Sequence, residues 1–239
     1  MKILECKSDV WFLIIILILL GSCFEVRGDE LTVYSSADDA YLREVDPDYN
    51  TARNDSCADY HNTEIGIHRF GQVYSGGNYY LPRSYLVFNT GSLGSQSILD
   101  SAKLFFYIEW LDTSDHWDMI VVEGFWDTDP PEACDFKTGV WIGEQSGGSK
   151  NTSGISAEYN SVTLNSTGLG WINKTGTTRL ALRSNRDING TPPPGSEQIQ
   201  HRSADYYGTD NDPYLEIWYH TGVPPEGVNR LLTKRQQRK

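Results

Sequence analysis

Short runs of aspartate occur at residues 38–39, 127–129 and 210–212 of this sequence. Hard cations such as Ca²⁺ are bound by several oxygen atoms, which Asp- and Asn-rich loops supply. None of the three runs has the length or the closing glutamate of an EF-hand loop, and an Asx turn is the alternative for each. If one pair of runs binds calcium, we expect Asp38 and Asp39 with Asp210 and Asp212, because the first and last strands are neighbours in many jelly rolls.

Aromatic side chains, 12% of the chain, indicate a second chemistry. Exposed rings stack on sugar rings, and nearby polar side chains orient the hydroxyl groups. Each ring alone could instead fill the core, but the group exceeds what one β-sandwich needs inside, so we expect some to be exposed. The expected sugar-binding residues are Tyr79, Tyr80, Trp117, Trp126, Tyr206 and Tyr207 with Arg69 and Arg186, and His68, Arg83, Arg183 and His201 are further candidate donors.

Motifs of nucleophilic, metallopeptidase or nucleotide chemistry are absent from the sequence. There is no G-x-S-x-G, H-E-x-x-H, P-loop or G-x-G-x-x-G in residues 29–221. A carboxylate pair for glycoside hydrolysis leaves no sequence signature, because the separation of the two groups depends on the fold. An enzyme is therefore an open alternative, and a binding domain is the interpretation we prefer.

The N-terminal 28 residues have the features of an export signal. An unbroken apolar run of 11 residues, 10–20, follows Lys2 and Lys7 and is too short to span a bilayer. Residues 20–23 (LGSC) are similar to a lipobox, in which Cys23 would be acylated. Cleavage after Cys23 or Gly28, or retention as an uncleaved anchor, are the alternatives. We expect a secreted or cell-surface protein that meets a membrane only through this leader or a lipid anchor.

Cysteines and glycosylation sequons agree with export. Cys57 and Cys134 remain outside the leader, and two cysteines in a secreted domain are expected to pair, with two buried thiols as the alternative. The N-x-S/T sequons predict N-glycosylation in a host that performs it, and otherwise mark turns. They lie at Asn54, Asn151, Asn165, Asn173 and Asn189.

The charge of the chain is unevenly distributed. Its formal net charge is −12; residues 1–28 are neutral overall, and residues 222–239 hold five basic groups and one acidic group. Residues 29–221 therefore carry −16, a charge that repels a phosphate backbone and argues against nucleic acid as a partner. Calcium and neutral sugars are compatible with it.

Short alternating runs between turn residues predict an all-β fold with about ten strands. Residues 102–110 alternate Leu104, Phe106 and Ile108 with Phe105, Tyr107 and Glu109, so this strand has an inward face and a partly aromatic outward one. Residues 214–220 alternate likewise, and residues 168–174 are the one short helix expected. We predict a single jelly-roll-like antiparallel β-sandwich at 29–221, followed by a Pro-containing linker and basic tail at 222–239.

Three stretches together resemble the DNRLRE domains, which are related to the non-catalytic module of disaggregatase and to a family of carbohydrate-binding modules. Residues 83–93 (RSYLVFNTGSL) and 98–108 (ILDSAKLFFYI) resemble the family's "R-x-L-x-x-F-D … V-x-S-A-x-L-x-L-x-V" core. Residues 37–42 and 203–217 resemble its opening and closing strands, although Arg202-Ser203-Ala204 stands where the family has S-R-E. The resemblance implies a jelly roll found beside polysaccharide-active enzymes and on cell surfaces, in some members binding acidic polysaccharides. We therefore expect a domain that attaches to a polysaccharide or glycoconjugate without cleaving it. A structural or adhesive surface or virion protein that contacts other proteins is the alternative.

Overall fold

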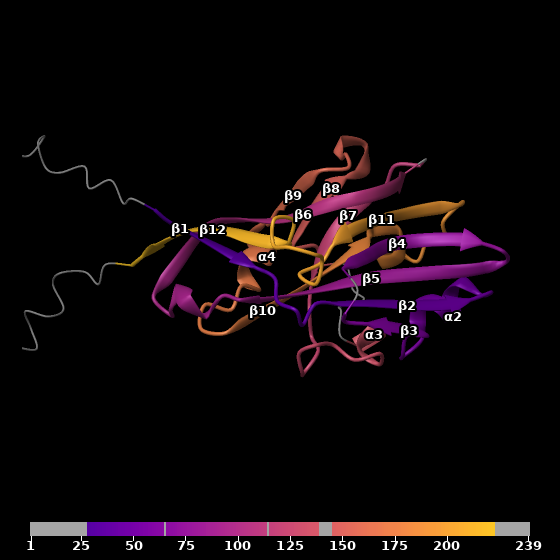
Figure 1. Cartoon of the computed structure of the whole chain (residues 1–239), viewed down its shortest axis with the longest axis horizontal. Coiled ribbons are helices and arrows are strands. Elements are labelled where there is room, and N and C mark those ends of the chain that lie inside the picture. The colour runs from indigo at the N-terminus through magenta and orange to yellow at the C-terminus, as the bar shows by residue number, and fades with distance from the viewer. Residues whose placement is uncertain (1–27, 65, 114, 139–144, 223–239) are drawn as a thin grey trace, which may run out of the picture.

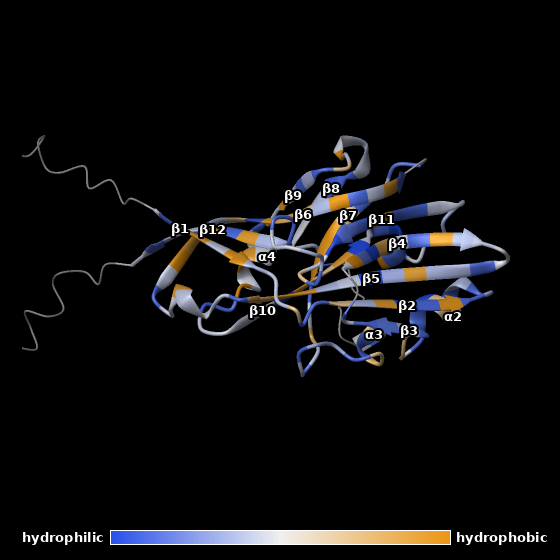
Figure 2. Cartoon of the chain, in the orientation of Figure 1, coloured by the Kyte–Doolittle hydropathy of each residue, from blue (hydrophilic) through white to orange (hydrophobic). Residues whose placement is uncertain are grey.

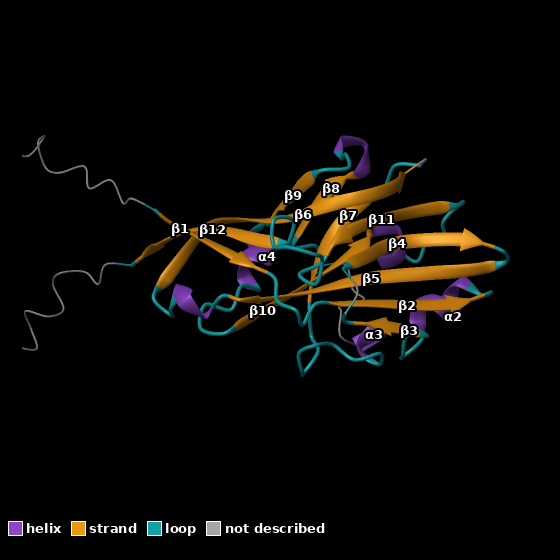
Figure 3. Ribbon diagram, viewed as in Figure 1, coloured by secondary structure: helices purple, strands orange, loops and turns teal. Residues whose placement is uncertain are grey.

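The computed structural model describes residues 28–64, 66–113, 115–138 and 145–222, and the predicted leader, Cys23 and the basic tail lie outside them. Strands form about half of the described chain (Figures 1 and 3). They are β1 (Asp29–Tyr34), β2 (Ala40–Asp46), β3 (Tyr60–Asn62), β4 (Ile67–Ser75), β5 (Asn78–Asn89), β6 (Ser97–Thr113), β7 (Asp118–Glu123), β8 (Gly148–Asn151), β9 (Tyr159–Thr163), β10 (Thr177–Ser184), β11 (Ser196–Arg202) and β12 (Tyr214–Thr221).

The long strand β6 joins two groups of strands. Its first part pairs with β12 and β9, and β1 pairs with β12, which gives the order β1-β12-β6-β9. Its last part pairs with β11, which continues as β11-β4-β5-β10-β7-β8, while β2 pairs with β5 and β3 pairs with β2. All of these pairs are antiparallel. The fold is thus all-β and jelly-roll-like, as predicted, with two antiparallel sheets that share β6.

The main core lies between the two groups of strands. Alternate residues of β6, namely Leu104, Phe106 and Ile108, are fully buried there, and they face Phe70 and Leu86 of the second group. Each such side chain is worth roughly 1.5–3 kcal/mol when it leaves water. The same alternation is visible as orange bands along the strands in Figure 2. The period-2 pattern of the sequence therefore selects the face of β6 that packs inward.

A second core covers the opposite face of β5, β7 and β10. It contains Leu81, Tyr85 and Val122 from the strands, together with Phe136 and Trp126 from the connections above them. A disulfide between Cys57 and Cys134, with an S–S distance of 1.97 Å, joins two of these connections across 77 residues. The predicted pairing is confirmed, and the bond ties the covering segments together.

The sequence predicted one short helix, and the structure has more than one. The described residues contain four α-helices of six residues or fewer: α2 (Tyr49–Asn54), α3 (Asp135–Thr138), α4 (Ser166–Gly170) and α5 (Asn185–Asn189). Two 3-10 turns, η1 (Gly91–Leu93) and η2 (Thr152–Gly154), accompany them. The predicted helix at 168–174 overlaps α4, which lies at Ser166–Gly170. Side chains of Asp48 and Ser184 cap α2 and α5, and these two helices were missed because the same side-chain caps occur in turns. In the described part of the chain no helix has the length and apolarity needed to cross a membrane.

Candidate functional site

Two of the predicted sugar-binding aromatics, Trp117 and Trp126, are buried. Each is only 2% exposed. Trp117 packs edge-on against Phe70 in the main core, with ring centroids 6.0 Å apart. Trp126 packs on Tyr85 in the second core, and its indole N–H donates to Asp129 at 2.7 Å. The prediction that these tryptophans form a binding surface was wrong, because Trp117 fills the main core and Trp126 the second core instead of projecting from loops.

The four predicted tyrosines lie in two separate places. Tyr79 and Tyr80 belong to the β4–β5 hairpin, where Tyr79 contacts Tyr74 with ring centroids 4.6 Å apart. Tyr206 and Tyr207 belong to the connection between β11 and β12, and Tyr207 is 99% exposed. The aromatics predicted as one site therefore do not form one.

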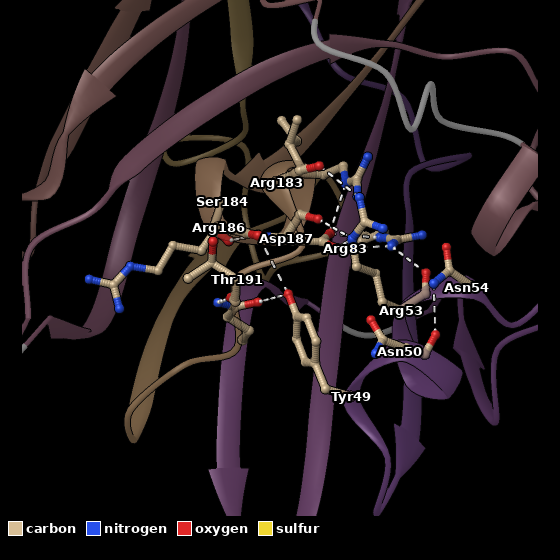
Figure 4. Close-up of polar contacts among 12 residues, drawn as sticks. Tyr49, Asn50, Arg53, Asn54, Arg83, Arg183, Ser184, Arg186, Asp187 and Thr191 are labelled. Atoms are coloured by element: carbon tan, nitrogen blue, oxygen red, sulfur yellow. Dashed lines mark hydrogen bonds and ion pairs between the residues drawn. The ribbon is translucent and has the colours of Figure 1, made fainter.

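The arginines offered as sugar ligands are mostly engaged by protein. Arg186 is ion-paired with Asp115 at 2.7 Å and with Glu197, whereas Arg69 is a half-buried residue of β4. Arg83 and Arg183 are fully buried, and the Nε atoms of both contact the same carboxylate oxygen of Asp187 (Figure 4), at N–O distances of 3.0 and 2.8 Å. Burial by itself would raise the pKa of Asp187, but the two guanidinium groups outweigh it and hold this pKa well below its usual range.

This buried cluster is a structural element. Asp187 also donates its backbone N–H to Ser184 at the start of α5, and the Arg83 guanidinium lies 3.9 Å from the centre of the Phe136 ring. The cluster thereby ties β5, β10, α3 and α5 together. Because Arg83, Arg183 and Asp187 are at most 1% exposed, a sugar cannot reach them without opening the fold.

His68 and His201 are likewise buried rather than available as donors. Nδ1 of His201 lies 2.8 Å from the Arg202 carbonyl oxygen and must carry the proton, since a carbonyl only accepts. Nε2 then accepts from the Ser84 hydroxyl at 2.7 Å. Burial lowers the pKa of His201 to about 4 and that of His68 well below its usual value, so both rings are neutral at physiological pH.

Five other aromatic rings form a continuous group on the outward face of β1, β12, β6 and β9, which we call the aromatic platform. Tyr34, Tyr214 and Phe105 lie opposite one another across three paired strands. Phe105 stacks on Tyr214 with ring centroids 4.6 Å apart and planes 7° from parallel. The ring centroid of Tyr214 lies 5.5 Å from that of Tyr34 and 5.7 Å from that of Tyr159. The ring centroids of Tyr159 and Tyr107 are 5.5 Å apart.

The platform is formed by the residues that alternate with the core. Phe105 stands between the buried Leu104 and Phe106, and Tyr214 precedes the buried Leu215. Tyr34 is 55% exposed and the other four rings are half-buried. The outward aromatic face of residues 102–110 and 214–220 was visible in the sequence. What the sequence did not reveal is that these strands pair in a register that brings the rings into contact.

Polar groups border the platform. The Arg202 guanidinium lies 4.4 Å from the centre of the Tyr107 ring and 4.1 Å from that of Tyr206, and it pairs with Glu109 at 2.7 Å. The Tyr159 hydroxyl donates to the backbone oxygens of Asp210 and Asp212. Burial, together with the neighbouring Tyr214 and aspartates, raises the pKa of Tyr159 to about 12, so its hydroxyl remains neutral.

The aspartates predicted to bind calcium do lie on neighbouring connections. The Ser35 backbone N–H donates to the Pro213 oxygen at 2.8 Å, which brings residues 35–39 next to residues 203–213. Asp39 and Asp212 are buried, Asp38 is half-buried and Asp210 is exposed. Among the described residues, no three His, Cys, Asp or Glu side chains form a group already arranged to hold a metal ion.

All five sequon asparagines are exposed. Several also make local bonds: Asn165 caps α4, and the Asn151 amide donates to Asp118 at 2.7 Å. Their exposure is what glycosylation requires, while these bonds are what the alternative interpretation as turns expects. Glycosylation stays a prediction.

No protein-family model and no curated protein matches the sequence. Among solved structures, the cryo-EM structure of Mud crab tombus-like virus is similar with a TM-score of 0.27 and 10% identity, covering 98% of this chain and 93% of the other. A likeness this distant carries no functional argument.

Proposed function

We propose that the protein binds a neutral polysaccharide at or outside the cell surface, without cleaving it, through the aromatic platform. The observation that carries this proposal is the contact of five partly exposed rings across four strands. Such a surface offers apolar area to the C–H faces of sugar rings, and the tyrosine hydroxyls at its border can bond to sugar hydroxyls. The resemblance to DNRLRE domains supports polysaccharide binding as such, and the choice of a neutral ligand rests on the charges described next.

The charges near the platform favour a neutral ligand over an acidic one. Arg202 is already paired with Glu109 on one side. On the other side, Lys103 lies near Glu216, and Glu30 is close enough to Glu216 to raise its pKa, although burial has the larger effect. No excess of positive charge results, and residues 29–221 as a whole are strongly acidic. An acidic polysaccharide would therefore be repelled.

Affinity electrophoresis against neutral polysaccharides (glucans, mannans and xylans) and acidic ones (alginate and pectate) tests the proposal. We expect retardation by at least one neutral polysaccharide. Replacing Tyr34 or Tyr214 by Ala should weaken that binding by about tenfold, since a factor of ten corresponds to ~1.4 kcal/mol, the size of one aromatic contact.

Tyr74→Ala is the matched control. Tyr74 is 45% exposed but lies on the β4–β5 hairpin outside the platform, so its removal should leave affinity unchanged. Loss of binding in Tyr74→Ala with full binding in Tyr34→Ala would move the site to the hairpin. A folded protein that binds none of the polysaccharides would refute the proposal and favour the platform as a contact surface for another protein.

A further inference from the structure

A further aromatic side chain, Trp218, lies on the same outward face as the aromatic platform. Side chains of β12 alternate between the two faces of the sheet, and Leu215 and Ile217 are fully buried. Tyr214, Glu216 and Trp218 therefore point outward, and Trp218 is half-buried. Because a strand rises ~3.4 Å per residue, Tyr214 and Trp218 are anchored about 13 Å apart. The face thus has two aromatic contact points in line along β12.

A row of polar side chains lies between these two contact points. Strand pairing places Glu216 between Thr32 of β1 and Lys103 of β6, three strands that run side by side (Figure 1). Lys103 pairs in turn with Thr163 of β9. All four side chains are at least partly exposed. A carboxylate accepts hydrogen bonds, an ammonium donates them and a hydroxyl does both, so this polar row can bond to the hydroxyl groups of a sugar without an excess of either charge.

Trp218 is a separate contact point and not a continuation of the platform. Its neighbours in the two adjacent strands are polar, namely Glu30 of β1 and Ser101 of β6. The Lys103 ammonium lies 5.4 Å from the centre of the Trp218 ring, which is within the range of a cation–π contact. Lys103 therefore holds the Trp218 ring beside the polar row.

The polar row favours a sugar chain over a protein as the partner of this face. The central part of a protein interface is depleted in charged side chains. Here Glu216 and Lys103 stand between the two aromatic contact points, at the centre of the face. A ligand that carries hydroxyl groups between its apolar faces can bond to them.

We propose that the ligand is a linear, extended polysaccharide that runs along β12 from Tyr214 to Trp218. This inference rests on the proposed function and names the form of the ligand. One sugar ring is too short to contact both aromatic points, whereas about 13 Å corresponds to roughly three units of an extended chain. A β-linked neutral glucan, mannan or xylan places successive rings along a nearly straight line. A helical or densely branched chain does not present two such rings to one sheet face.

Isothermal titration calorimetry of the whole chain with β-linked gluco-, manno- and xylo-oligosaccharides of two, four and six units tests this inference. In at least one series, the six-unit ligand should bind about tenfold more tightly than the two-unit ligand, because it gains one more aromatic contact. Trp218→Ala should remove this gain and leave binding of the two-unit ligand unchanged. Tyr214→Ala should weaken binding of both.

Trp110→Ala is the matched control. Trp110 is 43% exposed but lies on the last part of β6, opposite Gln200 of β11, so its removal should leave every affinity unchanged. Equal affinities for two and six units, or a length dependence that survives in Trp218→Ala, would overturn the extended site and leave the platform as the proposed binding surface. A folded protein that binds no oligosaccharide and no polysaccharide would overturn both. If Trp218→Ala does not fold, the length dependence of the wild-type protein decides alone.

Discussion

Replacing Asp187 by Asn should destabilise the protein by about 3–5 kcal/mol, although the two side chains have nearly the same shape. Asp187 accepts from Arg83 and Arg183, both fully buried, and its own side chain is 1% exposed. The amide removes the negative charge between two guanidinium groups and turns an N–H donor toward N–H donors. Most of the cost is the burial of positive charge that has lost its shared carboxylate.

Urea and thermal unfolding monitored by near-UV circular dichroism would measure this loss. For a domain of this length each kcal/mol lowers the unfolding temperature by roughly 2–4 °C, so we expect a decrease of about 6–20 °C. Glu109→Gln is the control, because it makes the same change of carboxylate to amide in the Arg202–Glu109 pair. The Glu109 side chain is 39% exposed, and the cost there should stay below about 1 kcal/mol.

The pH dependence gives an independent check. Because the pKa of Asp187 is lower in the folded than in the unfolded protein, its contribution is complete above the unfolded value near 4 and is lost as the pH falls below it. The stability difference between wild type and Asp187→Asn should therefore be constant from about pH 7 to 5 and narrow below about 4. A cost for Asp187→Asn no larger than that for Glu109→Gln would refute the argument that this carboxylate neutralises buried charge.

Three further outcomes follow from the described contacts. Replacing Cys57 and Cys134 together by Ala should cost about 4 kcal/mol in urea unfolding, since the bond closes a loop across 77 residues; an unchanged midpoint would contradict this. Trp117→Ala should lower the free energy of unfolding by roughly 3–5 kcal/mol. A variant as stable as the wild type would contradict the burial of this side chain. His201 should make the protein lose stability as the pH falls below about 6.5, because the unfolded ring gains a proton while the folded ring, with a pKa of about 4, does not. The slope, roughly 1.4 kcal/mol per pH unit, should be smaller in His201→Gln, and an equal slope would contradict the assignment.

Local periodicity and cysteine chemistry were sufficient to predict the fold class and the disulfide. The alternation through Leu104, Phe106 and Ile108 specifies which face of the strand is buried, because successive side chains point to opposite sides. The number of helices was misjudged, since helices of one turn leave only a capping residue and no apolar period.

The identity of the exposed aromatics required the tertiary structure. Trp117 and Trp126 lie in segments with the composition of loops, yet they fill the two cores. Burying a large aromatic ring removes much apolar surface from water, and this gain outweighs the local preference of the segment for an exposed loop. Conversely, Tyr34, Phe105 and Tyr214 are far apart in the sequence and become neighbours only through strand pairing. Composition and period thus determined the all-β architecture and the inward faces. Register, which depends on long-range pairing, decided which rings meet.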